Sequence, residues 1–527
     1  KSGAQAMMAT IKMNRHEALL HLQQVVEPTA RISADSRQIK VGDIFMAYAV
    51  GHGKALRDGR PYISKALELG TACVLYQANH DRSKSPGWES DLDDERCICV
   101  ENLAEDAGWI AAEWYGRPSQ TLKLIGVTGT NGKTSVTQWL AQTLSKHAAV
   151  IGTLGIGFSD QLHDVGYTTP DAPRLQTELF KLKQLGAQYV ALEVSSHALD
   201  QGRVNGTHFD CAVFTNLSRD HLDYHGTMAE YGATKAKLFK EFDAKRIVIN
   251  IEDSFGRSLF MDLMNRDDKM IWLYALNPAA FHNLEKLQDR FKLVYLQEFC
   301  FIENAYQCKI VIDGKVYPCT IPVLGEFNLE NALAVIATLI AEGIDIPEAL
   351  RQVECLRSVR GRMEIIKGAK ADAPMMVVDY AHTPDALQKV LETLRPIAAI
   401  RQGQIYCVFG CGGDRDREKR PMMGQIAREG SDHLVITSDN PRSEDPLQIM
   451  QMIFAGVRQA TNRKEDSKTV EMIADRAAAI MSAVRQASPQ DIVLVAGKGH
   501  ETTQEMNGKR FDFSDQAHLR LASGGAV

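Results

Sequence analysis

The sequence predicts a multidomain protein of the α/β class. Apolar runs typical of buried strands alternate with helical patterns along most of the chain, which indicates mainly parallel sheets covered by helices. With 527 residues, the chain is long enough for roughly three domains of ordinary size. Apolar residues make up 45% and charged residues 24%, so each domain has the material for a hydrophobic core.

The composition excludes several classes of protein. The 60 Lys and Arg against 66 Asp and Glu give a formal net charge of −6 without a long basic block, so nucleic acid is not an expected partner. The 10 cysteines are scattered and form no Cys-x-x-Cys pair, which is typical of free thiols in a reducing cytoplasm. No apolar run approaches the roughly 18 residues of a membrane span. Residues 1–9, which lack an initiating Met before Met7-Met8, are interpreted as an added leader.

Residues 10–117 read as a small α/β domain. Short apolar runs at 41–48, 72–76 and 97–100 predict its strands. The glycine-rich, basic loop at 51–60 could hold a phosphate or form a solvated hairpin, and its sequence favours the hairpin. A polar, proline-containing stretch at 116–120 predicts the first domain boundary.

The stretch from Leu122 to Ser135 predicts a phosphate-binding loop. An apolar strand runs into Gly129 and Gly132, and a helix is expected from about residue 135 to 146. A helix N-terminus behind such a loop binds phosphate, with Lys133 on the terminal phosphates and Thr134 on Mg²⁺. The strict P-loop pattern requires glycine where Val127 stands, so an ordinary strand-to-helix turn is the alternative.

The central segment, 118–357, predicts a parallel sheet with four polar clusters at strand ends. Expected strands are 122–127, 150–153, 189–192, 211–214 and 246–250, with helices at 173–185 and 228–242 and further strands within 265–319. The clusters are the phosphate loop, Thr168-Thr169, residues 193–197 and residues 216–221. Because ligands gather at the carboxyl ends of parallel strands, these clusters predict one site.

Several residues of this segment are candidates for chemistry. Glu193 ends a strand and is a natural Mg²⁺ ligand, although it could be a helix cap. His221 and His225 have helical spacing that could indicate zinc, but no further suitable ligands stand nearby. Lys235 falls on the apolar stripe of its helix, where it either reaches the surface or is kept for chemistry as a neutral amine with a lowered pKa. Such an amine can add CO₂ to form a carbamate.

Residues 358–527 predict a second α/β unit. Strands are expected at 375–378, 405–409, 433–437 and 492–495, and Thr383 caps a helix that has Pro384 in its first turn. Three loops follow strand ends, at 410–417, 439–442 and 497–501. Together they offer Arg for a carboxylate and Asp or Glu for an ammonium group, which suits a zwitterionic amino acid.

Taken together, these motifs resemble the Mur ligase family over essentially the whole chain after the leader. The resemblance is carried by residues 128–134, 192–197, 215–223, 325–328, 361–364, 379–385, 439–442 and 497–501. The phosphate loop of that family has the same one-residue offset, which removes the objection raised by Val127.

The resemblance implies three domains and a reaction. A small N-terminal α/β domain would bind the UDP end of the substrate, a central domain with a P-loop-type sheet would bind ATP, and a Rossmann-like C-terminal domain would bind the amino acid. The implied enzyme is a cytoplasmic, monomeric, Mg²⁺-dependent ligase. It would use ATP to add meso-2,6-diaminopimelate to UDP-N-acetylmuramoyl-L-alanyl-D-glutamate through an acyl phosphate, in the peptidoglycan synthesis on which cell shape and division depend. No nucleic acid or membrane span is implied.

The resemblance also implies residue roles. ATP contacts fall on Gly129, Thr130, Asn131, Gly132, Lys133, Thr134, Ser135, Asn331, Arg362 and Asp379. Metal-side ligands would be Thr134, Glu193, His221 and Lys235 as its carbamate, and Lys133, Lys235, His221 and Glu193 would form the catalytic set. The UDP-substrate would touch Ser36, His52, Thr168, Thr169, Ser195, Gln201 and Arg203. Diaminopimelate would touch Arg415, Asp439, Asn440, Pro441, Arg442, Gly497 and Glu501.

The chain departs from the family pattern at two places, and rival functions remain open. The loop around His52 is longer than usual, and Tyr167 stands where many relatives carry Asn. Within the class, the rivals are a ligase that adds lysine and folylpolyglutamate synthetase. Outside it, the rival is a regulatory P-loop protein that hydrolyses ATP only to change shape. The 439–442 loop favours diaminopimelate, because its Arg can pair with the distal carboxylate that lysine lacks.

Overall fold

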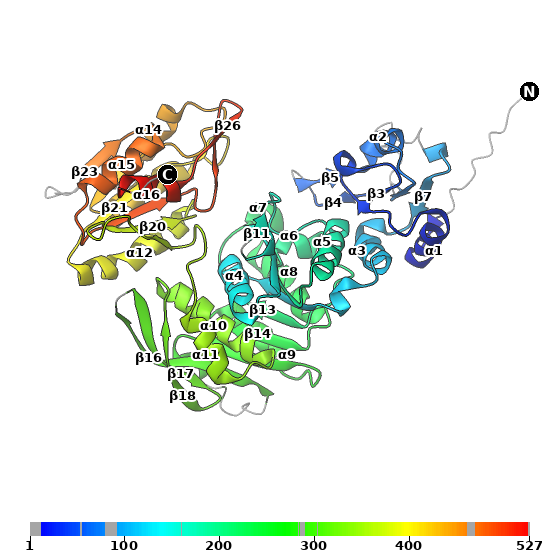
Figure 1. Cartoon of the computed structure of the whole chain (residues 1–527), viewed down its shortest axis with the longest axis horizontal. Coiled ribbons are helices and arrows are strands. Elements are labelled where there is room, and N and C mark those ends of the chain that lie inside the picture. Colours follow the sequence, from blue (N-terminus) through cyan, green and yellow to red (C-terminus); the bar gives the residue numbers. More distant parts are fainter. Residues whose placement is uncertain are drawn as a thin grey trace, which may run out of the picture. The chain divides into compact units, whose positions relative to one another are not determined.

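Among the described residues, three large β-sheets organise the chain (Figure 1). The computed structural model describes residues 12–52, 55–78, 92–159, 161–282, 284, 290–302, 304–460 and 469–524, so the leader interpreted at 1–9 lies outside it. The chain divides into two compact units. The first contains Lys1–Cys300, Gln307–Ile321 and Glu330–Cys355, and the second contains Phe301–Tyr306, Pro322–Leu329 and Leu356–Val527. The predicted domain limits at 117/118 and 357/358 stay predictions.

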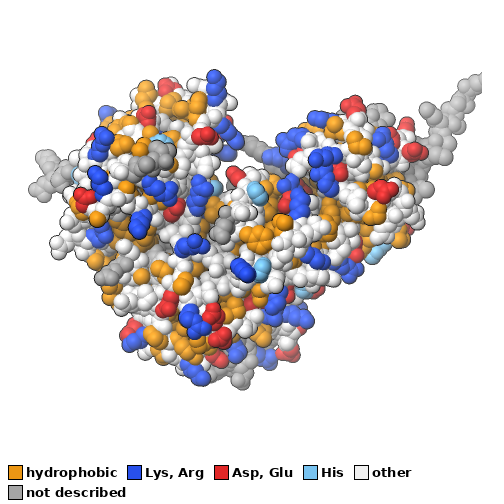
Figure 2. Space-filling model, in the orientation of Figure 1, with side chains coloured by type: hydrophobic (Ala, Val, Ile, Leu, Met, Phe, Trp, Pro, Cys, Tyr) orange, Lys and Arg blue, Asp and Glu red, His pale blue; other side chains and the backbone are white. Residues whose placement is uncertain are grey.

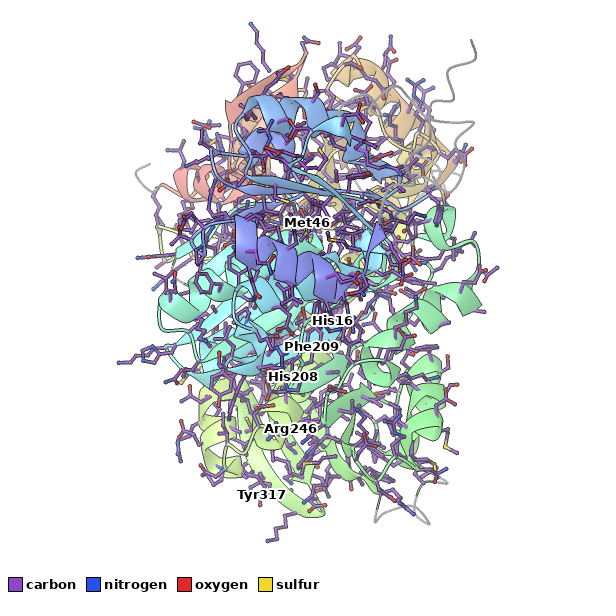
Figure 3. The ribbon with its side chains drawn as sticks, turned by 90° about the vertical axis from the view of Figure 1, so that its right-hand side faces the viewer. His16, Met46, His208, Phe209, Arg246 and Tyr317 are labelled. Atoms are coloured by element: carbon purple, nitrogen blue, oxygen red, sulfur yellow. The ribbon has the colours of Figure 1, made fainter. Side chains whose placement is uncertain are left out.

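A five-stranded sheet in the first unit has all its strands parallel. Its order is β1 (Lys12–Met13), β7 (Cys97–Val100), β6 (Cys73–Tyr76), β3 (Ile44–Ala47) and β2 (Ile32–Ser33). The helices of this part are α1 (Arg15–Val25), α2 (Ile63–Glu68) and α3 (Leu103–Trp114), and a hairpin joins β4 (Ala49–Val50) to β5 (Arg57–Asp58). Met46, labelled in Figure 3, is fully buried in β3.

The second sheet of the first unit has 11 strands in the described parts of the chain. Its order is β11 (Gln161–His163), β10 (Gly155–Phe158), β9 (Ala148–Gly152), β12 (Tyr189–Glu193), β8 (Lys123–Thr128), β13 (Cys211–Phe214), β14 (Arg246–Asn250), β15 (Met270–Ala275), β16 (Lys292–Ile302), β17 (Ala305–Ile312) and β18 (Lys315–Ile321). From β9 to β16 the neighbours are parallel, whereas β10 is antiparallel to β9 and to β11.

The strands at the centre of this sheet are apolar on both faces because helices cover them. The helices of this part are α4 (Lys133–Leu144), α5 (Ala172–Gln184), α6 (Ser196–Asp200), α7 (Leu222–His225), α8 (Met228–Lys240), α9 (Ser254–Leu263), α10 (Glu326–Ala341) and α11 (Ile346–Glu354), and α4, α5, α8 and α9 are among those that pack on the sheet. Phe209, labelled in Figure 3, is fully buried in the core, with its ring centroid 5.6 Å from that of Phe242. Glu193 at the end of β12 pairs in register with Val127 of β8, and Phe214 of β13 pairs with Thr128. The predicted convergence of strand ends is therefore confirmed.

The second unit contains a six-stranded sheet with helices on both faces. Its order is β19 (Glu364–Ile366), β20 (Met375–Asp379), β24 (Ile492–Ala496), β21 (Ile405–Phe409), β22 (His433–Ile436) and β23 (Thr469–Met472), and only β19 is antiparallel to its neighbour. One face packs on α12 (Pro384–Arg401), α13 (Lys419–Gly430) and α14 (Pro446–Ala460), and the other on α15 (Arg476–Gln486) and α16 (Asp515–Ala522). A hairpin of β25 (Thr503–Met506) and β26 (Lys509–Asp512) follows β24.

The architecture confirms the predicted mixed α/β class, with several domains and a large, mainly parallel central sheet. None of the 10 cysteines, all of which the structure describes, is part of a disulfide bond. Figure 2 shows Lys and Arg interspersed with Asp, Glu and apolar side chains on the face that it presents. Of the helices that the structure describes, none has the length and apolar character needed to cross a bilayer.

Glu342, just after α10, is a buried carboxylate with few polar contacts to offset the loss of its hydration. Its side chain has 0% exposure and lies 3.7 Å from Arg246 Nη1 (Figure 3 labels Arg246), and neither carboxylate oxygen has a hydrogen-bond partner among the described residues. Burial raises the pKa of Glu342, although the charge of Arg246 opposes this shift. The folded state therefore binds this proton more tightly than the unfolded state, and stability is lost as the pH rises through the raised pKa.

Glu342→Gln is accordingly expected to raise the free energy of unfolding by about 1 kcal/mol near pH 8. The gain should shrink as the pH falls towards the unfolded carboxyl pKa, because the wild-type carboxyl group then becomes neutral as well. Thermal unfolding of both proteins between pH 5 and pH 8 measures this difference. A variant less stable at every pH would instead mean that the pair with Arg246 is net stabilising.

Candidate active site

Two glycines shape the loop between β8 and α4. Gly129 has φ +152°, and a Cβ there would lie 1.9 Å from Thr215 Oγ1. Gly132 has φ +85°, and a Cβ there would lie 2.4 Å from Asn331 Oδ1. Only glycine fits both places, and the loop leads directly into the N-terminus of α4, which favours an anion. Asn331, predicted for the adenosine end, therefore lies beside the phosphate loop.

Two lysines donate hydrogen bonds to one carbonyl of this loop. Lys133 Nζ donates to Gly129 O at 2.8 Å and to Thr130 O at 3.0 Å, and Lys235 Nζ donates to Gly129 O at 3.0 Å. Lys235 is 1% exposed, with Nζ 4.6 Å from the centroid of the Tyr231 ring. Burial, and to a lesser extent the charge of Lys133, lowers the pKa of Lys235 far below its ordinary value. Of the two alternatives left open for Lys235, the structure shows a buried side chain and not one that reaches the surface.

The Glu193 carboxylate connects the ends of β12 and β9 with the N-terminal turn of α4. It is 1% exposed and accepts hydrogen bonds from Thr134 Oγ1 at 3.0 Å, Thr153 N at 2.9 Å and Thr153 Oγ1 at 3.1 Å. Thr153 Oγ1 also lies 3.1 Å from Thr168 Oγ1. Thr153 was missed by the sequence analysis, although its place directly after β9 fits the same strand-end logic.

Thr134 and Glu193 have the chemistry that Mg²⁺ requires. A hydroxyl and a carboxylate side by side are hard oxygen ligands, and Mg²⁺ takes only a few of these from protein when phosphates supply the rest. By contrast, within the described ranges no group of three or more His, Cys, Asp and Glu side chains could hold a metal ion. The zinc alternative therefore gains no support from the fold.

His221 lies in a cluster of aromatic side chains. It precedes α7 with φ +51°, and its Nε2 is 3.4 Å from Asp220 Oδ2. Its ring centroid lies 4.9 Å from that of His197 and 6.2 Å from that of Tyr231. Tyr231 in turn reaches the phosphate loop through Thr130, with 3.1 Å between their hydroxyl oxygens. His221 is thus near the loop, and its metal-side role stays a prediction.

Four residues predicted to bind the UDP-substrate form one hydrogen-bonded group. Thr169 Oγ1 donates to Glu193 O at 2.7 Å and accepts from Ser195 N at 3.2 Å. Arg203 donates to Thr169 O at 2.9 Å through Nη1 and to Gln201 Oε1 at 2.7 Å through Nη2. This group is bonded to the main chain of Glu193, whose carboxylate accepts from Thr134 at the start of α4, so a substrate held here would lie near the phosphate loop.

The N-terminal part of the first unit also reaches this group. His52, in the β4–β5 hairpin, stacks on Tyr224 with 4.5 Å between ring centroids, and Gln201 Nε2 donates to Tyr224 OH at 3.1 Å. The hairpin favoured by the sequence is therefore present, and its His52 is held against the central segment. Ser36 is buried at the start of a short 3₁₀ helix, Ser36–Gln38.

Arg362 and Asp379, which were predicted to bind the adenosine end of ATP, lie close together in the second unit. Asp379 accepts hydrogen bonds from Met363 N and Ala381 N, both at 2.7 Å. Burial raises the pKa of Asp379, while the charge of Arg362 opposes this shift. Arg362 Cζ lies 4.7 Å from the centroid of the Tyr380 ring, which leaves a cationic and aromatic surface beside a buried carboxylate.

The predicted amino-acid loops also meet in the second unit. Asn440 Nδ2 donates to Glu501 Oε2 at 2.8 Å, and Gly497 lies beside Asp439. Arg442 has φ +51°, and its Nη1 donates to Gly413 O at 2.7 Å, which connects this loop to the one after β21. The exposed Arg415 lies on that same loop after β21.

The β25–β26 hairpin holds the 439–442 loop from its other side, a contact that the sequence did not predict. Gln504 Nε2 donates to Asp439 O at 2.7 Å, and Glu505 N donates to Asn440 Oδ1 at 3.0 Å. Arg442 N donates to Glu505 O at 3.0 Å. The 439–442 loop is therefore held by Gly413 on one side and by the β25–β26 hairpin on the other.

Comparison with known proteins shows to which protein family the chain belongs. The model of the Mur ligase middle domain matches residues 127–339, and that of the Mur ligase, glutamate ligase domain matches residues 361–499. The chain belongs to the Mur ligase family and is an ATP-dependent amide ligase.

Relatives that are similar over nearly the whole chain share one name. A UDP-N-acetylmuramoyl-L-alanyl-D-glutamate--2,6-diaminopimelate ligase of Ralstonia nicotianae is 45% identical over 95% of this chain and 94% of its own length. A protein of the same name from Pseudomonas putida is 43% identical over 93% of this chain and 94% of its own length. A solved structure of an enzyme of this name has a TM-score of 0.65 and 35% identity, covering 94% of each chain.

Proposed function

We propose that this chain joins meso-2,6-diaminopimelate to UDP-N-acetylmuramoyl-L-alanyl-D-glutamate at the expense of ATP. The proposal rests on the hydrogen bond that joins the 439–442 loop to the 497–501 loop. These loops place an arginine and carboxylates where one amino acid could bind them. The shared name of the full-length relatives supports the same substrate pair. We further propose that the chain acts as a monomer in the cytoplasm, within peptidoglycan precursor synthesis.

The reaction follows from the groups around the phosphate loop. The side-chain carboxylate of the D-glutamate residue attacks the γ-phosphorus of ATP, the bond to the β,γ-bridging oxygen breaks, and ADP leaves. Lys133 and the N-terminus of α4 stabilise the charge that develops on the phosphate oxygens. The amine of diaminopimelate then attacks the acyl carbon and loses a proton, and inorganic phosphate leaves with the electrons of the carbon–oxygen bond.

Mg²⁺ would be held by Thr134 and Glu193 and would neutralise phosphate charge when bound. Lys235 is proposed to carry a carbamate, formed when its neutral amine adds CO₂ and releases a proton. The deep burial of Lys235 and its lowered pKa support this, because only an unprotonated amine reacts with CO₂. The carbamate and His221 are proposed as further metal-side ligands.

The proposal predicts that phosphate release depends on the amino acid supplied. With ATP and the UDP-dipeptide present, diaminopimelate should support release at least about 100-fold faster than lysine or glutamate, because only its distal carboxylate can add a two-pronged contact with Arg442 to the looser pair with Glu505 at 3.7 Å. The assay measures inorganic phosphate, and mass spectrometry identifies the peptide product. Equal turnover with lysine would favour the lysine-adding rival. ATP hydrolysis without UDP-dipeptide and without product would favour a regulatory ATPase.

A further inference from the structure

Lys498 lies at the centre of the amino-acid loops. It is 0% exposed, and its Nζ donates to Asn440 Oδ1 at 3.0 Å and to Glu501 Oε2 at 2.9 Å. The same nitrogen lies 3.7 Å from Asp439 Oδ1. The side chain thus joins two loops that follow different strands, and the residue roles expected from the sequence leave it without a function. We call Asp439, Asn440, Lys498 and Glu501 the lysine-centred cluster.

Lys498 determines how its polar neighbours point. Asn440 Oδ1 accepts from Lys498 and from Glu505 N at 3.0 Å, so the amide nitrogen must face Glu501, to which it donates at 2.8 Å. Glu501 Oε2 therefore receives two donors, Lys498 Nζ and Asn440 Nδ2. An amide and a carboxylate held in this way cannot rotate without breaking a buried hydrogen bond.

The charges of the cluster favour a cationic ligand. Two carboxylates and one ammonium leave one negative charge when all are ionised. Asp439 Oδ1 has no hydrogen-bond partner in the part of the chain that the structure describes. Burial raises the pKa of Asp439 against the opposing charge of Lys498. For Glu501, burial also raises the pKa, but Lys498, Asn440 and His500 together outweigh it and the pKa is lowered. A ligand ammonium would supply the missing positive charge.

The backbone beneath the cluster is held separately by a buried ion pair. Arg476 Nη1 donates to Ser438 O at 3.2 Å, and Nη2 donates to Ala496 O at 3.0 Å, the residues that directly precede the two loops. Arg476 also pairs with Asp515 at 2.8 Å, with both side chains at 0% exposure. Since Arg476 fixes the strand ends, loss of Lys498 should disturb the side chains of the cluster more than its backbone.

We propose that Lys498 is a positioning residue for the amino donor. It orients Asn440 and Glu501 and sets the charge of their site so that one substrate ammonium is bound. This role rests on the proposed function, because it requires an amino acid as the ligand of these loops. Lys498 acts through Asn440 and Glu501 and does not itself contact the reacting atoms.

The test is Lys498→Met in the whole chain, which keeps an unbranched side chain of nearly the same length and removes its charge and donors. We expect the KM for diaminopimelate to rise at least about tenfold, since hydrogen bonds to charged groups are worth that much. The KM values for ATP and for the UDP-dipeptide should stay within about twofold. The matched control is Lys269→Met, because Lys269 also has a buried side chain, 3% exposed, whose Nζ donates to Ala244 O at 2.7 Å in the first unit.

Two outcomes would overturn the role of Lys498. One is an unchanged KM for diaminopimelate, and the other is a parallel rise in all three KM values, which a merely structural residue would produce. If Lys498→Met does not fold, Lys498→Gln is measured against the same expectations. Failure of the proposed function is distinguishable, because the unmodified chain itself would then form no product with diaminopimelate.

Discussion

Replacing Lys235 by alanine is expected to lower ligation to below about one hundredth of the unmodified rate, while ATP still binds. The substitution removes the buried amine 3.0 Å from Gly129 O, and with it the proposed carbamate beside the phosphate loop. Lys133 and the N-terminus of α4 remain to hold ATP. The measurements are phosphate release with all three substrates and ATP binding by calorimetry.

Two further variants separate chemistry from packing. Lys235→Met fills the same space without an amine and should be folded and equally inactive. Lys240→Ala changes a lysine of the same helix that is 44% exposed and paired with Asp262 at 2.7 Å, and should be fully active. Exposed pairs of this kind contribute less than about 1 kcal/mol. Undiminished ligation by Lys235→Ala would mean that the lysine serves only to pack α8 against the sheet.

The spacing of apolar residues and the position of polar residues at strand ends predicted much of the site, because both can be read from the local sequence. The spacing of apolar residues around Lys235 placed it on the apolar face of α8 but left open whether its side chain reaches the surface, and its 1% exposure shows that it does not. Likewise, the position of Glu193 at the end of an apolar strand predicted its closeness to the loop, and its bond to Thr134 confirms that expectation.

Contacts between distant segments could not be predicted in the same way. Lys498 sits directly after Gly497 in a motif whose neighbours were assigned, yet its partner Asn440 is 58 residues away. The spacing of residues reveals which face of an element is buried, but not which polar group of another loop will meet it. The hold of the β25–β26 hairpin on Arg442 was missed for the same reason.

Arg442→Ala is expected to remove the preference for diaminopimelate over lysine. The kcat/KM for diaminopimelate should fall at least about 100-fold, whereas the low value for lysine should change little, because lysine lacks the distal carboxylate. Arg442 is well placed for this contact. Its main chain is fixed by Glu505 and its Nη1 by Gly413 O, and a guanidinium has five donors, so these bonds orient the head group without using all of them.

The ratio of the two kcat/KM values is the measurement, taken for Arg442→Ala, Arg442→Lys and the control Arg510→Ala on the exposed strand β26. Lysine at 442 should restore little activity, since an ammonium cannot make the planar, two-pronged contact of a guanidinium with a carboxylate. Arg510→Ala should keep the unmodified ratio. If Arg442→Ala also keeps it, the distal carboxylate is bound by another cation, and Arg415 on the neighbouring loop becomes the residue to replace next.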